Sequence, residues 1–276
     1  MKSQKNEMKT SNLLESDWQM WGIPLCSRDK SGVLRIVGNW LDFKQKNKWI
    51  ATVNPEFMMK TTKDSSFLAL LSKTDLNVID GIGLIWAREI DKKAKGRNII
   101  CRLLIGFQVG VEILKGKHRE GLASGSDLVN DFCQLAAEKG YPVYFLGGWE
   151  DRAERTAKYF KNKYPKLEIR GFYAGKAEGE DEKTIKKIGQ KRIDFLFVAY
   201  GMRKQEEWIE RNIKKLNVGV AMGIGRSFDY YSGDLKRAPL VWRKIGMEWL
   251  YSLIQEPKRW RRQLELPKFV WKVLFT

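Results

Sequence analysis

Short runs of apolar, β-branched and aromatic residues alternate with longer amphipathic stretches through the middle of the chain. The apolar runs have the length of buried strands, and the stretches between them repeat apolar residues at helical spacing. We expect strands at residues 49–54, 77–80, 142–148, 167–175, 194–201 and 218–225. We expect helices at residues 55–74, from 81 onward, and at 125–140, 150–165, 180–192 and 204–216. This alternation predicts an α/β fold, a Rossmann-like, mostly parallel sheet with helices on both faces.

Two segments do not follow this alternation, and they carry most of the positive charge. Residues 88–119 contain nine Lys and Arg against three Asp and Glu, around an apolar stretch at 99–114. Residues 234–276 contain ten against four, and include tryptophans at positions 242, 249, 260 and 271. Together the two segments hold +12 of a formal net charge of +18. Cations beside apolar and Trp side chains are typical of helices that lie on an anionic membrane surface.

Length and composition indicate one large folded domain with additions at its ends. The chain has 276 residues, of which 43% are hydrophobic and 12% aromatic, which is enough apolar matter for a core. We divide it into a polar N-terminal tail (1–17), an α/β domain (18–233) and a basic, Trp-rich helical C-terminal appendage (234–276). The tail lacks the apolar centre of a signal peptide, and no uncharged apolar run reaches the ~18 residues of a spanning helix.

Several kinds of chemistry are missing from the sequence. His118 is the only histidine and is expected at the surface, and the three cysteines lie far apart, which argues against a zinc site of His and Cys. The odd number of scattered cysteines favours a reducing cytoplasm. The chain has neither a GxxxxGK[ST] phosphate loop nor an Asp-x-Asp pair. We therefore expect no metal and no cofactor, with any bound phosphate held by basic side chains and backbone amides.

A carboxylate follows the strand expected at 77–80. In a parallel α/β sheet, ligands bind at the carboxyl ends of the strands. Asp80 is our candidate general base, because a carboxylate there could take a proton from an incoming hydroxyl. The amides of Gly81 and Gly83 could face a phosphate. An Asp before a helix also serves as a helix cap, and the sequence leaves both roles open.

Other loops at the same edge of the sheet offer polar groups or a close approach to the backbone. These candidates are Thr52, Asn54, Gly147, Gly148, Gln205 and Glu206. Each has a simpler explanation: an Asn-Pro step starts a helix, paired glycines make turns, and acidic residues complement a helix N-terminus. In the appendage, the candidates for gripping a diphosphate are Arg237, Arg259, Arg261 and Arg262, each of which could equally lie on a solvated helix face.

Taken together, these segments resemble the WecG/TagA/CpsF glycosyltransferase family (glycosyltransferase family 26). The matching stretches are ATVNPE, IDGIGLIWA, GSDLV, VYFLGG, FLFVAYGMRKQEEWI, SFDYYSGDLKRAP and GMEWLYSLIQEPKRW. They occur in family order over roughly residues 48–87 and 124–262. Their joint occurrence is far more specific than any single stretch.

The resemblance implies an inverting, metal-independent glycosyltransferase. Its substrates would be a UDP-sugar donor, typically UDP-N-acetylmannosamine, and a polyprenyl-diphosphate-linked sugar at the cytoplasmic, inner face of the cell membrane. By motif, Asp80 would be the catalytic base, with Thr52 and Asn54 beside it and Gln205 lining the pocket. The appendage would contact the membrane as a peripheral anchor and bring arginines such as Arg259 to the lipid diphosphate.

The chain departs from the family pattern at four places. Arg203 stands where the family usually has Pro, and Ser252 stands where it has Arg. Residues 122–124 replace the usual Arg-Val-Thr, and about 88–119 look like an insertion. These changes affect the expected identity of the acceptor and of the sugar more than the expected class of reaction.

Two other classes of protein share some of these sequence features. A basic nucleic-acid-binding α/β protein is the alternative suggested by charge, but the chain has no recognisable RNA or DNA motif, so we expect no nucleic-acid partner. A dinucleotide oxidoreductase is disfavoured because no GxGxxG follows the first strand. The oligomeric state stays open, a homo-oligomer included.

Overall fold

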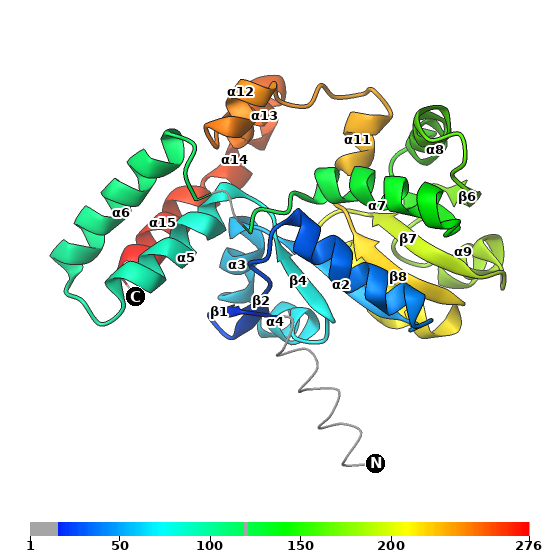
Figure 1. The fold of residues 1–276 in the computed structure, drawn as a ribbon, viewed down its shortest axis with the longest axis horizontal. Helices are drawn as coiled ribbons and strands as arrows, with labels where there is room; N and C mark the ends of the chain where they lie inside the picture. Colours follow the sequence, from blue (N-terminus) through cyan, green and yellow to red (C-terminus); the bar gives the residue numbers. More distant parts are fainter. Residues whose placement is uncertain (1–15, 119–120, 276) are drawn as a thin grey trace, which may run out of the picture.

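A six-stranded parallel sheet forms the centre of the molecule. The computed structural model describes residues 16–118 and 121–275, apart from the side chain of Arg259. The strand order is β4-β3-β8-β7-β5-β6, and every neighbouring pair is parallel (Figure 1). The strands are β3 (Lys48–Val53), β4 (Leu76–Ile79), β5 (Val143–Gly147), β6 (Ile169–Tyr173), β7 (Ile193–Ala199) and β8 (Val218–Gly223). The predicted α/β class and all six predicted strands are confirmed.

Helices cover both faces of this sheet. On one face, α2 (Lys30–Asp42), α7 (Gly125–Lys139), α8 (Arg152–Lys163) and α11 (Ser227–Tyr231) enclose one buried apolar cluster. On the other face lie α3 (Pro55–Thr61), α4 (Ser65–Leu71), α5 (Ile82–Ala94), α9 (Asp181–Ile188), α10 (Lys204–Asn212) and η1 (Ile213–Lys215). Trp208 of α10 is fully buried there. The carboxyl ends of the strands are left at one edge of this three-layer body.

The expectation of a single helix at 55–74 is wrong. The segment forms two helices, because the side chain of Asp64 accepts a hydrogen bond from the Phe67 amide (3.1 Å) and starts α4 as a separate helix. The sequence pattern does not predict the elements within residues 18–47. They form a short hairpin of β1 (Trp18–Met20) and β2 (Ile23–Leu25), followed by α2.

The C-terminal segment is helical, as expected, and folds back onto the body. Its elements are α12 (Leu240–Lys244), α13 (Glu248–Gln255), η2 (Pro257–Arg259), α14 (Trp260–Gln263) and α15 (Glu265–Phe275). Helices α12 and α13 have no buried residues, whereas α15 buries Phe269 and Val273 in the apolar core. The appendage therefore combines an exposed arm with a helix that belongs to the core.

The two basic segments that are distant in the sequence meet in the fold. Helix α6 (Ile99–Leu114) packs against both α5 and α15 (Figure 1). His118, expected at the surface, is half-buried, with its Nε2 2.5 Å from Glu112 Oε2. No helix among the described residues is long and apolar enough to cross a membrane.

Candidate active site

Asp80 lies at the carboxyl end of β4 and does not cap the helix that follows. The N-cap of α5 is Gly81, and this helix start has no side-chain cap. The Asp80 carboxylate instead accepts a hydrogen bond from the backbone amide of Gly125, at the start of α7. A Cβ at Gly125 would lie 3.1 Å from Thr52 Cγ2 and 3.4 Å from Asp80 Oδ2. Glycine at this position therefore lets the α7 backbone approach both side chains.

The surroundings of Asp80 favour its protonated form. Burial, followed by the charge of Glu248 on α13, raises the pKa of the Asp80 carboxyl to about 7. The Gly125 amide and the cation of Arg237 act in the opposite direction. A carboxyl with a pKa near neutrality can both take up and release a proton under cellular conditions, which is what a general base requires.

Thr52 and Asn54 are placed at the neighbouring strand end. Thr52 is buried, and its hydroxyl donates to the backbone carbonyl of Gly223 on β8 (3.0 Å). The Asn54 side chain accepts from the Phe57 amide (3.1 Å) and caps α3, the simpler of the two roles considered for it. Thr52 thus joins β3 to β8 at the edge where Asp80 lies.

Gln205 and Glu206 form a buried pair beside the end of β8. Gln205 Nε2 donates to Glu206 Oε1 (2.7 Å), and Gln205 Oε1 accepts from the Gly225 amide (2.9 Å). Glu206 Oε2 accepts from the Arg203 amide (2.7 Å). Burial raises the pKa of Glu206 to about 7. A Cβ at Gly223 would come within 2.7 Å of both side chains, so this pair packs directly on the strand that Thr52 contacts.

Close packing explains three of the four candidate glycines, and the fourth, Gly81, has a φ of +110°. A Cβ at Gly83 would lie 2.7 Å from Pro55 Cγ, where α5 crosses the start of α3. Gly147 has a φ of +97°, and a Cβ there would lie 2.8 Å from the backbone carbonyl of Ala199. A Cβ at Gly148 would lie 3.1 Å from Arg152 Cβ. These features account for the glycines, and phosphate binding by their amides stays a prediction.

The appendage brings Arg237 to the Asp80 side of the sheet. Its Nη1 donates to Asp127 Oδ1 on α7 (2.6 Å), and its Nε lies 3.4 Å from Glu248 Oε1. Arg262 is placed differently, because its guanidinium pairs bidentately with Glu56 at the start of α3 (2.8 Å for each contact). The side chain of Arg259 lies outside the described residues. The predicted arginines thus reach the body at two separate points near the strand ends.

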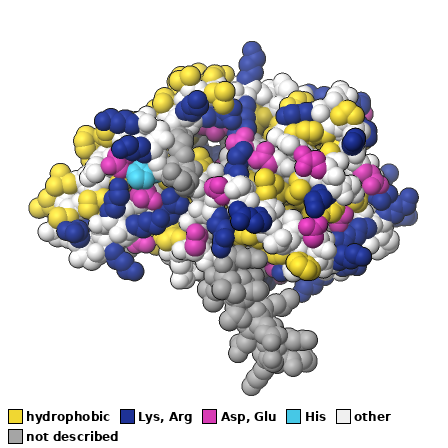
Figure 2. Space-filling model, in the orientation of Figure 1, with side chains coloured by type: hydrophobic (Ala, Val, Ile, Leu, Met, Phe, Trp, Pro, Cys, Tyr) yellow, Lys and Arg dark blue, Asp and Glu magenta, His cyan; other side chains and the backbone are white. Residues whose placement is uncertain are grey.

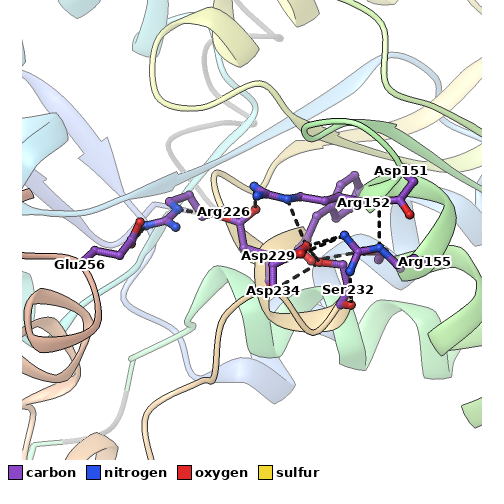
Figure 3. Close-up of polar contacts among 10 residues, drawn as sticks. Asp151, Arg152, Arg155, Arg226, Asp229, Ser232, Asp234 and Glu256 are labelled. Carbon is purple, nitrogen blue, oxygen red and sulfur yellow. Dashed lines mark hydrogen bonds and ion pairs between the residues drawn. The ribbon is translucent and has the colours of Figure 1, made fainter. Parts of the chain in front are cut away.

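A network of charged side chains, which the sequence did not indicate, also joins the appendage to the body. Arg226, in the loop after β8, pairs with Glu256 at the end of α13 and with Asp229 (2.7 Å) on α11 (Figure 3). Asp229 also forms an ion pair with Arg152 of α8, whose Nη1 lies 2.6 Å from Asp229 Oδ1. Arg152 Nε lies 3.1 Å from Asp234 Oδ2. The acidic members Asp229, Asp234 and Glu256 lie in the family-like stretches, but their pairing leaves no local pattern because the ion pairs join residues far apart in the chain.

Arg203, which stands where the family usually has Pro, holds α10 against α4. It adopts a φ of +73° at the N-cap and forms ion pairs with Asp64 and with Glu207 (2.7 Å). This departure therefore has a structural use close to Gln205. Within 16–118 and 121–275, no three His, Cys, Asp or Glu side chains gather as a metal-binding group.

Known proteins are similar to this chain over most of its length. The model of the "Glycosyl transferase WecG/TagA/CpsF family" matches residues 18–104 and 98–276, two stretches that overlap at the start of α6. An N-acetylglucosaminyldiphosphoundecaprenol N-acetyl-beta-D-mannosaminyltransferase of Bacillus spizizenii is 31% identical over 244 residues, or 88% of this chain and 85% of that protein. A protein of the same name from Staphylococcus aureus is 27% identical over 249 residues, or 89% of this chain and 88% of that protein. The chain therefore belongs to the WecG/TagA/CpsF family of glycosyltransferases.

Proposed function

We propose that this protein transfers N-acetylmannosamine from a UDP-linked donor to N-acetylglucosamine carried on a polyprenyl diphosphate, a step in the synthesis of a cell-surface polysaccharide or teichoic acid. The observation that carries the proposal is the Asp80 carboxyl, with its pKa near 7, at the edge of the sheet where Thr52 of the neighbouring strand also lies. The activity for which the two relatives are named supports the choice of sugar and acceptor.

The chemistry follows from one base at the sheet edge. Asp80 takes the proton of the acceptor hydroxyl as its oxygen attacks the anomeric carbon of the donor sugar. The bond from that carbon to the diphosphate oxygen breaks on the opposite side, so UDP leaves with the bonding electrons and the anomeric centre inverts. Basic side chains and backbone amides balance the charge of the departing diphosphate, and the proposal includes no metal and no cofactor.

Substrate would be held between the strand ends and the appendage. Gln205 is fixed by Glu206 and the Gly225 amide, so its orientation is set before substrate arrives. Arg237 lies on the appendage side of Asp80, close enough to oppose the rise in its pKa. We assign Gln205, Arg237 and Asn54 to substrate binding. We assign Arg259 and Arg262 to the lipid diphosphate, and Arg262 would release its ion pair with Glu56 to bind it.

The appendage would place the enzyme at the inner face of the cell membrane. Its exposed arm carries Leu240, Val241, Trp249 and Trp260, all of them at least 39% exposed. Apolar and Trp side chains of this kind bind at the boundary between headgroups and acyl chains. A peripheral position there gives the site access to an acceptor whose polyprenyl tail stays in the bilayer.

Incubating the protein with UDP-sugars and a short-chain polyprenyl-diphosphate N-acetylglucosamine tests the proposal, with product linkage determined by NMR. We expect transfer from UDP-N-acetylmannosamine and a rate that rises with pH until Asp80 is ionised, near pH 7. Asp80→Asn should lower the rate by about 10²–10⁴-fold while donor binding survives. Asp91→Asn, which removes a carboxylate from α5 away from the strand ends, is the matched control. Equal turnover in the two variants would contradict the assignment of the base.

A further inference from the structure

Helix α6 presents a continuous apolar stripe to the outside of the molecule. From residue 99 to 107 its exposed members repeat at the three- and four-residue spacing of one helix face, and the last member follows two turns later. They are Ile99 (38% exposed), Ile100 (65%), Leu103 (42%), Leu104 (65%), Phe107 (74%) and Leu114 (55%). Over the 16 residues of α6, a stripe of this kind is about 24 Å long. Exposure of this many large apolar side chains in a row marks an interaction surface.

The opposite face of α6 is fixed to the body, so the stripe cannot turn inward. The carbonyl of Gly106 accepts a hydrogen bond from Trp86 Nε1 on α5 (2.9 Å). A Cβ at Gly106 would lie 3.0 Å from Leu274 Cδ2 on α15, which shows how closely the helices approach. Val109 and Ile113 are buried on the same side. The outward direction of the stripe is therefore a fixed property of the fold.

The charges around the stripe are of one sign. The exposed residues Lys95 and Arg97 precede α6, and the exposed residues Lys115 and Lys117 follow it. The one carboxylate of the helix, Glu112, is turned away to Lys93 (3.1 Å) and to His118. The apolar stripe therefore has cations at both ends, and no carboxylate of α6 lies beside it.

Helix α15, which packs against α6, carries two further exposed aromatic side chains. Trp271 (65% exposed) and Phe275 (48%) stack on each other, with ring centroids 3.9 Å apart. Together with Lys268 and Lys272 they line a groove against α3. Figure 2 shows apolar side chains along the left edge of the molecule, over α6, and along the top, over the exposed arm of the appendage.

We infer that the outer face of α6, together with Trp271 and Phe275 on the adjacent α15, is a second membrane-contacting surface that binds anionic lipid. Cations at both ends of an apolar stripe complement acidic headgroups, whereas they would repel the same cations on a second copy of this chain. Two contact areas, α6–α15 and the exposed arm, fix the orientation of the enzyme on the bilayer, which one helix would leave free to tilt. The inference rests on the proposed function in that the acceptor lies in a membrane.

Vesicle binding of the full chain tests this surface directly. The double variant Leu104→Gln/Phe107→Gln removes the two most exposed large side chains at the middle of the stripe. Phe43→Gln is the matched control, because Phe43 is equally exposed (77%) but follows α2 on the body. Binding is measured by co-sedimentation with vesicles of phosphatidylglycerol and phosphatidylcholine in equal parts, and with phosphatidylcholine alone. Transfer is measured in parallel on a water-soluble short-chain acceptor.

We expect the double variant to bind the anionic vesicles at least about tenfold more weakly than the wild type, with Phe43→Gln unchanged. Transfer to the water-soluble acceptor should be the same in all three proteins, and a wild type inactive on it would contradict the proposed function without affecting the vesicle result. Unchanged vesicle binding by the double variant, or an equal loss in Phe43→Gln, would overturn the inference. A change in oligomer mass in the double variant, with vesicle binding intact, would overturn it in favour of an interface between copies.

Discussion

Replacing Asp80 with Asn tests the electrostatics of the site through stability as well as activity. Burial and Glu248 raise the pKa of Asp80 to about 7, from an ordinary value of 3.8. Below about pH 4 the carboxyl is protonated in both the folded and the unfolded chain, so it does not affect their balance. Between about pH 4 and pH 7 only the unfolded chain loses this proton, and the free energy of unfolding therefore falls as pH rises.

The size of the effect follows from the two pKa values. Their difference corresponds to about 4 kcal/mol above pH 7. Asp80 is half-buried, so solvent screening reduces this figure, and we expect a net effect on the order of 2 kcal/mol. An Asn side chain still offers an oxygen to the Gly125 amide and never ionises. Asp80→Asn should thus be more stable than the wild type by about 2 kcal/mol at pH 8 and equal to it at pH 4.

Urea unfolding followed by circular dichroism at the two pH values measures this difference. Asp91→Asn again serves as the control for removing a carboxylate elsewhere. If Asp80→Asn is no more stable than the wild type at pH 8, or gains the same stability at both values, the reasoning about the buried carboxyl is refuted. A higher free energy of unfolding together with a loss of glycosyl transfer is the result expected for a catalytic residue that destabilises the fold.

Three further predictions concern the supports of the site. Gly147→Ala should destabilise the fold by about 2 kcal/mol or more in urea unfolding, because its Cβ would clash with the Ala199 carbonyl in a conformation with positive φ; a neutral effect would contradict the packing. Thr52→Val should cost about 1 kcal/mol by losing a buried hydrogen bond, and lower kcat more than it raises KM, which steady-state kinetics would show. Arg226→Ala should remove the ion pair to Glu256 and raise KM for the lipid acceptor several-fold with donor binding unchanged, and an unaltered KM would show that this ion pair does not position the appendage.

Local sequence patterns were sufficient for the central sheet. Each strand is an apolar run bounded by turn residues, and buried parallel strands need little else. Local patterns did not predict the structure of residues 55–74 correctly, because the apolar spacing continues across the point where one helix ends and the next begins. The break depends on the Asp64 side chain capping α4, which competes with helix continuation at a single position.

Asp80 shows the limit of sequence reasoning about the site. Its place after β4 allowed both a general base and a helix cap, of which the cap is the commoner role for Asp at such a position. Only the fold decides that the carboxylate turns to Gly125 instead of capping α5, and that burial beside Glu248 raises its pKa. The same is true of Gln205, whose partners at Glu206 and Gly225 are fixed by the crossing of α10 and β8.

Short-range patterns in the sequence were enough to predict the six strands, most of the helices that cover them, the family and the concentration of positive charge in two segments. These properties depend on residue types at short spacing, which one chain displays directly. The tertiary structure decided that α6 and α15 lie side by side, that Arg237 reaches Asp127, and that an apolar stripe faces outward. Such contacts join residues far apart in the chain, and they depend on how whole elements pack, which no local pattern records.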